Sequence, residues 1–105
     1  MNQINQILIE GDVTNDIVET SHNTAEFKIS TTCFRRNLHG QMVKVVESFD
    51  IQLLGSARDL WKERVQKGFI VRIVGYLKWE QQRIVIVAEH IDLKPFSDKE
   101  GEKCL

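Results

Sequence analysis

The stretch Phe69-Ile-Val-Arg-Ile-Val-Gly-Tyr-Leu-Lys-Trp79 decides the fold, because it is the longest run in the chain with the pattern of a β-strand. Its apolar and small residues alternate with a second set that carries charge and an aromatic ring, namely Arg72, Tyr76 and Lys78. Three residues, 80–82, separate this run from a second apolar run at residues 83–91. The two runs therefore predict an antiparallel hairpin on which the other elements pack.

The length and composition predict one folded domain. A chain of 105 residues has the size of a single domain, and its 42% hydrophobic and 28% charged residues are ordinary for a globular protein. Pro95 ends the regular pattern, so we expect a domain at residues 1–94 and a short flexible tail at residues 95–105. The sequence shows neither an apolar run of about 18 residues nor a signal-peptide pattern, so we expect a cytoplasmic protein.

Charge and cysteine content exclude some classes of protein. A net charge of -1 argues against a strongly basic nucleic-acid binder, although a neutral chain can still gather Lys and Arg on one face. Cys33 and Cys104 lie far apart and have neither the spacing of a zinc site nor that of a disulfide framework. We expect both to be free thiols.

Three further strands precede the hairpin. The first is expected at residues 4–13, bent at Gly11, with residues 17–19 continuing it after a kink. The second is expected at residues 25–32, where apolar and polar residues alternate, and the third at residues 43–54. The polar residues 34–41 between the second and third strands predict an exposed loop.

One helix is expected between the third and fourth strands. Ser56 is its predicted N-cap with Asp59 three residues later, and Lys67-Gly68 is its predicted end. Trp61 lies on the apolar stripe of this helix and is expected in the core. The order of elements is typical of an all-β, five-stranded Greek-key barrel, the OB-fold, with one helix between strands 3 and 4.

Three segments resemble one known family. Residues 5–16, 49–55 and 67–77 are similar, in order and spacing, to the first strand, the third strand and the fourth strand of bacterial single-stranded DNA-binding proteins. The resemblance covers residues 4–94. It implies an OB-fold that binds single-stranded DNA without strong sequence preference, usually as a homotetramer, in DNA replication, recombination or repair.

The chain departs from that family at several positions. Ser48 and Leu54 stand where family members usually carry aromatic rings, and Asp12 beside Glu10 would repel a phosphate. The loop at residues 80–82 is short, and the acidic C-terminal tip of the family has no counterpart in residues 99–105. These differences indicate a divergent or specialised member.

Residues that still suit DNA binding follow from strand alternation and from the basic loop. Basic grooves track phosphates, and aromatic faces stack on bases. The candidates are Lys28, Phe34, Arg35, Arg36, Arg72, Tyr76, Lys78 and Trp79. For Trp79, packing over the mouth of the barrel is an equal alternative.

No catalytic constellation is evident, and we expect neither an enzyme nor a cofactor or metal. His22, His39 and His90 are scattered and have no ligand-spaced partners. The acidic residues of the first strand leave a metal-dependent nuclease as a minor alternative, because Glu10, Asp12 and Asp16 could hold Mg²⁺.

Two functional hypotheses remain open. The first is a single-stranded DNA-binding module, and the alternative is a replication-restart accessory protein, similar to primosomal replication protein N, that acts mainly through protein contacts. Both predict self-association into a homodimer or homotetramer through the first strand, where Ile7, Leu8 and Ile9 place apolar side chains on both faces. Replication proteins are possible further partners.

Overall fold

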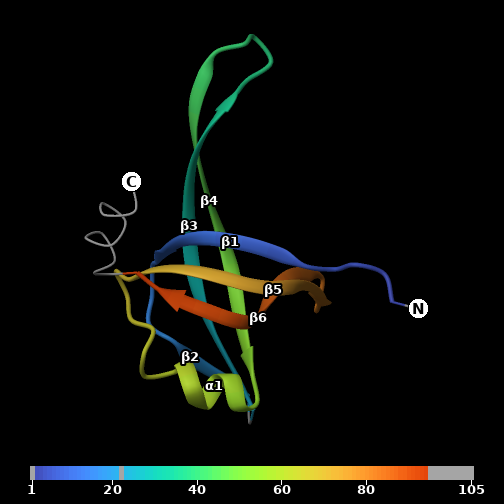
Figure 1. Cartoon of the computed structure of the whole chain (residues 1–105), viewed down its shortest axis with the longest axis vertical. Coiled ribbons are helices and arrows are strands. Elements are labelled where there is room, and N and C mark those ends of the chain that lie inside the picture. Colours follow the sequence, from blue (N-terminus) through green and yellow to red (C-terminus); the bar gives the residue numbers. More distant parts are fainter. Residues whose placement is uncertain (1, 22, 95–105) are drawn as a thin grey trace.

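A computed structural model describes residues 2–21 and 23–94 of the chain (Figure 1). Its elements are β1 (Ile7–Val13), β2 (Val18–Ser21), β3 (Thr24–Arg36), β4 (Met42–Leu54), α1 (Ser56–Trp61), β5 (Ile70–Glu80) and β6 (Arg83–Leu93). In this described part of the chain, no helix has the length and apolar character needed to cross a membrane.

The strands form one closed barrel. The order is β1-β5-β6-β4-β3-β2, and an additional pairing of β1 with β3 closes the sheet. β4 and β6 pair in parallel, whereas the other neighbours are antiparallel. Five strands make the barrel, and α1 lies between the third and fourth of them, which confirms the predicted OB-fold.

The barrel interior is filled by the alternating apolar residues of each strand. Side chains on successive positions point to opposite faces of a sheet, so alternate residues in the barrel parts of β3, β4 and β5 enter the core. Fully buried members include Phe27, Ile29, Ile51, Leu53 and Ile73. Trp61 on α1 is partly buried and packs against this cluster, as expected.

The second strand differs from the prediction. Residues 18–21 do not continue β1 but form a separate short strand that pairs with the start of β3, with Val18 opposite Glu26. All four of its residues are exposed, so it adds an edge to the sheet and no core. It forms because the turn after Ser21 brings the chain straight back into β3.

The helix is shorter than predicted, and its predicted cap is wrong. Gly55, with φ of 55°, is the N-cap, no side chain caps the helix, and the helix ends at Trp61. The next residues form turns that place Val65 in the core with 3% of its surface exposed. The helix ends early because the turns that follow it bury Val65 in the core and lead the chain to the start of β5.

The predicted loop at residues 34–41 is confirmed at residues 37–41, but its first three residues belong to β3. β3 and β4 remain paired as far as Arg36 opposite Met42, so the loop is reduced to residues 37–41. Asn37 closes it, because its side-chain oxygen accepts hydrogen bonds of 2.9 Å from the backbone N–H groups of His39 and Gln41. Figure 1 shows this hairpin extending well beyond the barrel. We call residues 31–47 the arm.

Candidate nucleic-acid interface

The eight predicted binding residues do not form a single patch. Three of them lie on the arm, and the other five lie on barrel strands. Those on the barrel are Lys28 of β3 and Arg72, Tyr76, Lys78 and Trp79 of β5. Each group has a different electrostatic environment.

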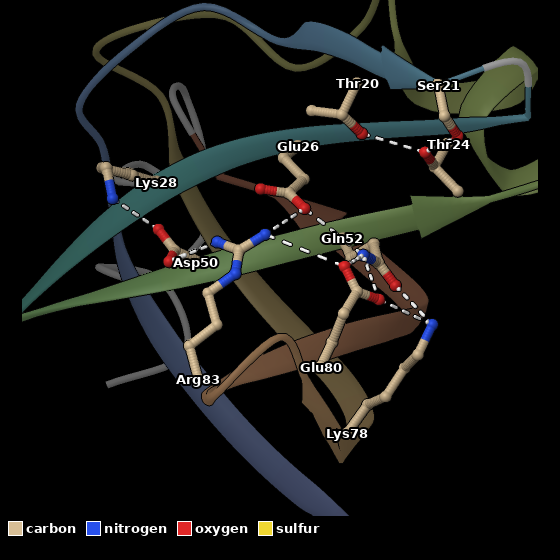
Figure 2. A network of polar contacts seen from close by, with 10 residues as sticks. All are labelled: Thr20, Ser21, Thr24, Glu26, Lys28, Asp50, Gln52, Lys78, Glu80 and Arg83. Carbon is tan, nitrogen blue, oxygen red and sulfur yellow. Dashed lines mark hydrogen bonds and ion pairs between the residues drawn. The ribbon is translucent and has the colours of Figure 1, made fainter.

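Lys28 and Lys78 belong to a polar network on the outer wall of the barrel (Figure 2). We call it the wall network; its members are Glu26, Lys28, Asp50, Gln52, Lys78, Glu80 and Arg83. Lys28 pairs with Asp50, and Lys78 pairs with Glu80 at 3.0 Å. These two predicted cations therefore face carboxylates of the same protein.

Arg83 connects three strands within the wall network. Its two terminal nitrogens lie 2.9 Å from a carboxylate oxygen of Asp50 on β4 and 2.7 Å from one of Glu26 on β3. The geometry joins β6 to its neighbour and to the strand beyond it. Arg83 begins β6 directly after the tight turn, where its role in the network was not predicted.

Gln52 lies at the centre of the network and is 2% exposed. Its amide nitrogen donates to Glu26 at 3.3 Å and to Glu80 at 3.2 Å, and its amide oxygen accepts from Lys78 at 3.1 Å. A buried amide without partners would be costly, so these contacts fix the side chains around it. The wall network is thus a rigid layer over the barrel.

Ion pairing shifts the protonation equilibria of the wall network. The hydrogen bond from Lys28 is the main cause that lowers the pKa of Asp50, and Arg83 adds to it against partial desolvation. The hydrogen bonds from Lys78 and Gln52 lower the pKa of Glu80. Glu26 raises the pKa of Arg83 through its hydrogen bond. Asp50, Glu80 and Arg83 therefore stay charged at neutral pH.

Arg72 is paired on another side of the barrel. It lies opposite Glu10 of β1, and the two side chains are 3.0 Å apart. Lys94 lies 3.8 Å from the same carboxylate. Glu10 is thus held by cations, and within residues 2–21 and 23–94 no group of three His, Cys, Asp or Glu side chains is placed to hold a metal.

The outer face of the arm combines a ring with positive charge. Residues directly opposite each other in paired strands share a face, and Phe34 is opposite Lys44 while Arg36 is opposite Met42. The Phe34 side chain is 65% exposed. We call this the outer arm face; it comprises Thr32, Phe34, Arg36, Met42, Lys44 and Val46 and contains no carboxylate.

Arg35 points to the opposite face of the arm. It lies across from Val43, and it lines a hollow of about 810 Å³ between the arm and β1. Three carboxylates also line this hollow, those of Glu10, Asp12 and Glu47. The two adjacent arginines therefore meet different surroundings, one acidic and one free of acids.

The two predicted aromatic residues of β5 also lie on opposite faces. Tyr76 is half-buried on the outer wall, where it is opposite Val87. Trp79 is 70% exposed and lies opposite Ile84 at the end of the hairpin. An apolar hollow of about 480 Å³ opens nearby and is lined by residues that include Ile84, Leu77 and Leu8.

Lys44 was not among the predicted site residues. Lys44 falls within the strand predicted at residues 43–54, but its position opposite Phe34 depends on pairing with residues 34–36, which the sequence pattern assigned to a loop. Extending the second predicted strand forward to residue 36 and pairing it with the third would have found it. His22, Cys104 and the predicted tail at residues 95–105 lie outside the described residues.

Comparison with known proteins gives functional parallels. The chain is 28% identical over 102 residues to the single-stranded DNA-binding protein of Aquifex aeolicus, and the match covers 86% of this chain and 69% of that protein. The chain resembles single-stranded DNA-binding proteins. This confirms the resemblance inferred from its sequence motifs, although no protein-family model matches the chain.

Solved structures of the same kind share its fold. The Plasmodium falciparum SSB in complex with single-stranded DNA superposes with a TM-score of 0.71 at 20% identity, covering 89% of this chain and 95% of that one. The SSB of Thermus aquaticus superposes with a TM-score of 0.68 at 24% identity, and the match covers 86% of this chain and 50% of that one. PriB from Ralstonia solanacearum superposes with a TM-score of 0.59 at 15% identity, and the match covers 87% of this chain and 98% of that one. At these identities the likenesses show the OB-fold.

Proposed function

We propose that this chain is a non-enzymatic module that binds single-stranded DNA with little sequence preference. Its setting would be the bacterial nucleoid in the cytoplasm, in DNA replication, recombination or repair. The similarity to the Aquifex aeolicus single-stranded DNA-binding protein supports the class of ligand. The outer arm face supports the place of contact.

The observation that carries the proposal is the grouping of Phe34, Arg36 and Lys44 on one exposed face. An exposed ring stacks on any base, because every base presents a flat aromatic face, and each such stack contributes about 1–3 kcal/mol. The two cations beside the ring suit the phosphates on either side of a stacked base. Together they make a binding surface that is indifferent to sequence.

Charge separates the arm from the rest of the molecule. The whole chain has a net charge of -1, yet residues 31–47 contain Arg35, Arg36 and Lys44 against one acid, Glu47. Glu47 is opposite Thr31 on the inner face. A polyanion is therefore attracted to the outer arm face, whereas the rest of the chain carries a net charge of -3, from 11 Lys and Arg against 14 Asp and Glu.

Self-association through β1 is part of the proposal. β1 pairs with β5 along residues 7–12, but its other edge meets β3 only at Asp12 and Val13. Residues 7–11 thus present an open strand edge, beside which the Leu8 side chain is 68% exposed. An edge of this kind is suited to pairing with a second copy, as a homodimer or within a homotetramer.

One observation favours the alternative, an accessory module that acts through contacts with replication proteins. Ser48 and Leu54 lie on the outer side of β4 where the related family usually carries rings, and Asp50 and Gln52 between them belong to the wall network. The barrel wall therefore lacks stacking positions on β4. The structural likeness to PriB agrees with this alternative without deciding for it.

A binding titration tests the proposal. Fluorescence anisotropy of a labelled poly-thymidine oligonucleotide is followed at low and at moderate salt for the wild type, Phe34→Ala and Val46→Ala. Val46 is a matched control because it is an exposed apolar residue on the same face but has no ring. We expect salt-sensitive binding that Phe34→Ala weakens by about tenfold, the lower part of the range for a lost stack, and that Val46→Ala leaves nearly unchanged.

Two results of this titration would contradict the proposal. If the wild type shows no saturable binding at low salt, the proposed function is wrong and the accessory alternative is favoured. If the wild type binds but both substitutions have the same effect, the DNA does not stack on Phe34, and the contact lies elsewhere on the molecule.

A further inference from the structure

We infer that Glu26, Asp50 and Glu80 compete with DNA phosphates for the cations of the barrel wall, and so confine bound DNA to the arm. This inference rests on the proposed function, because it concerns how the same DNA is held. It assigns a role to three carboxylates that lie beside the binding surface and do not contact the ligand.

The outer arm face and the wall network lie on one continuous surface. Side chains two residues apart on a strand share a face, so the series Phe34, Ser30, Lys28 and Glu26 runs along the same side of β3. Across from it, Ser48 and Asp50 continue the side of β4 that carries Lys44. A DNA strand that follows the arm toward the barrel therefore arrives at Lys28.

The cations on this part of the wall are already engaged by carboxylates. Lys28 pairs with Asp50, Arg83 pairs with Glu26 at 2.7 Å, and Lys78 pairs with Glu80 at 3.0 Å. Figure 2 shows Glu26, Glu80 and Lys78 around Gln52, with Arg83 connecting this group to Asp50 and Lys28. Their formal charges cancel, so the wall offers an approaching phosphate no net attraction.

The carboxylates lie deeper than the cations that they hold. The side chains of Glu26, Asp50 and Glu80 are 16%, 23% and 26% exposed, whereas those of Lys28, Arg83 and Lys78 are 54%, 38% and 37% exposed. Gln52 fixes two of the carboxylates from below. Glu26 and Glu80 therefore stay in place, and a phosphate that binds their cations must compete with these carboxylates.

Neutralising one carboxylate should therefore free its partner cation to bind a DNA phosphate. Asp50→Asn keeps the size of the side chain and an oxygen that can accept a hydrogen bond, but it removes the charge facing Lys28. We expect about threefold tighter binding of poly-thymidine at low salt, and a salt dependence steeper by about 0.7, the value for one further phosphate contact on a single strand.

Two further variants separate this mechanism from a change in net charge. Glu63→Gln is the matched control, because it alters the charge equally at an exposed residue in the turn after α1. Lys28→Gln should change binding by less than about 1.5-fold in the wild type, since Lys28 is held by Asp50. In the Asp50→Asn background, the same substitution should abolish the gain.

A second pair of variants protects the test against a folding defect at Asp50. Glu80→Gln, alone and combined with Lys78→Gln, repeats at the other end of the network the comparison made with Asp50→Asn and Lys28→Gln. Thermal unfolding confirms that each variant is folded. Tighter binding by either carboxylate variant, lost when its partner lysine is also replaced, supports the inference.

The inference and the proposed function fail in different ways. If the wild type binds and Asp50→Asn and Glu80→Gln behave like Glu63→Gln, the inference is overturned while the proposed function stands. If neither the wild type nor any carboxylate variant binds the oligonucleotide, both are overturned.

Discussion

Arg83 of β6 and Asp50 of β4 form a 2.9 Å ion pair across the parallel seam of the barrel. At this seam Ile51 lies opposite Ile86 and Gln52 lies opposite Val87. The ion pair lies just outside this short ladder, and Arg83 also reaches Glu26 one strand further on. The side chain of Arg83 therefore supports the barrel at one of its two shortest ladders, the other being that of β1 with β3.

Removing this guanidinium should weaken the barrel modestly. We expect Arg83→Gln to lower the free energy of unfolding by a small but measurable amount, because the pairs are partly exposed and the acids left behind can regain water. Urea unfolding measures the change. Lys62→Gln is the control, since Lys62 reaches Glu19 only at 3.7 Å on an exposed surface. An equal effect of both substitutions would mean that the seam does not depend on Arg83.

Stability should also depend on the charge of Asp50 at acidic pH. Its pKa in the folded protein is below the ordinary value of 3.8, chiefly because Lys28 donates a hydrogen bond to it. The unfolded chain thus binds this proton more readily, so the contribution of Asp50 is present above pH 3.8 and is lost as the pH falls through the lower folded value.

The comparison of wild type with Asp50→Asn checks this sign. At about pH 7 the variant should be less stable by about 1 kcal/mol, a figure discounted for the exposure of Lys28, and the difference should shrink as the pH falls below 3.8. Urea unfolding at several pH values provides the measurement. A difference that grows as the pH falls would contradict the assigned cause.

Gly75 is expected to be irreplaceable for steric reasons. It lies at the irregularity in the pairing of β5 with β6, and a Cβ atom added there would overlap the backbone carbonyl of Val87. Backbone atoms cannot yield as a flexible side chain does, so Gly75→Ala should cost about 3 kcal/mol of stability.

Gly40 supplies the control for that substitution. A Cβ atom added there would meet nothing within 4 Å, and its cost comes from the φ of 81° alone. Gly40→Ala should therefore lose about 1 kcal/mol. Thermal unfolding of both variants makes the comparison, and a larger loss at Gly40 would show that β5 and β6 can move apart.

The two adjacent arginines of the arm should differ in DNA binding. Arg36 shares the outer arm face with Phe34, whereas Arg35 faces the acidic hollow beside β1. We expect Arg36→Gln to weaken poly-thymidine binding about threefold and to reduce the salt dependence by about 0.7, and Arg35→Gln to have a smaller effect.

This pair is well matched because both substitutions remove one charge from neighbouring positions. Arg36 also donates a 2.8 Å hydrogen bond to the carbonyl of Gly40, so Lys44→Gln serves as a second variant that leaves the loop contact intact. Stronger weakening by Arg35→Gln than by the other two would place the DNA on the inner face of the arm.

An acidic substitution on β1 should disrupt self-association. Leu8→Asp places a charge beside the open strand edge at residues 7–11, and two copies would bring these charges together. We expect a lower mass in sedimentation equilibrium. Leu60→Asp is the control, because Leu60 is 49% exposed on α1, away from this edge. Unchanged assembly with Leu8→Asp would exclude β1 as the contact.

Strand alternation predicted the barrel well. The period of two marks residues that must be buried, and Val71, Ile73, Phe27 and Ile29 are buried as their positions indicated. The helix was harder to predict, because its end is set by the need of the barrel for Val65 and not by the capping residues. Ser56 has the sequence pattern of an N-cap and Gly68 that of a helix end, but the helix is capped at Gly55 and ends at Trp61.

The binding surface was only partly visible in the sequence. Both faces of the arm meet solvent, so residues 34–36, which extend β3 into the arm, show no apolar alternation and resemble a loop. The pairing of Lys28 and Lys78 with Asp50 and Glu80 was also hidden, because the acids that neutralise them are set by register and side-chain geometry. Strand parity showed which residues face outward and gave no information on their partners.

The length of the arm has a consequence for how DNA first meets the molecule. Arg36 lies eight residues along β3 from Lys28, a distance of about 26 Å in an extended strand. This is about three times the screening length of about 8 Å at physiological ionic strength. A diffusing strand is thus drawn to the tip of the hairpin before it senses the acids of the wall, so added salt should slow its capture more than it speeds its release.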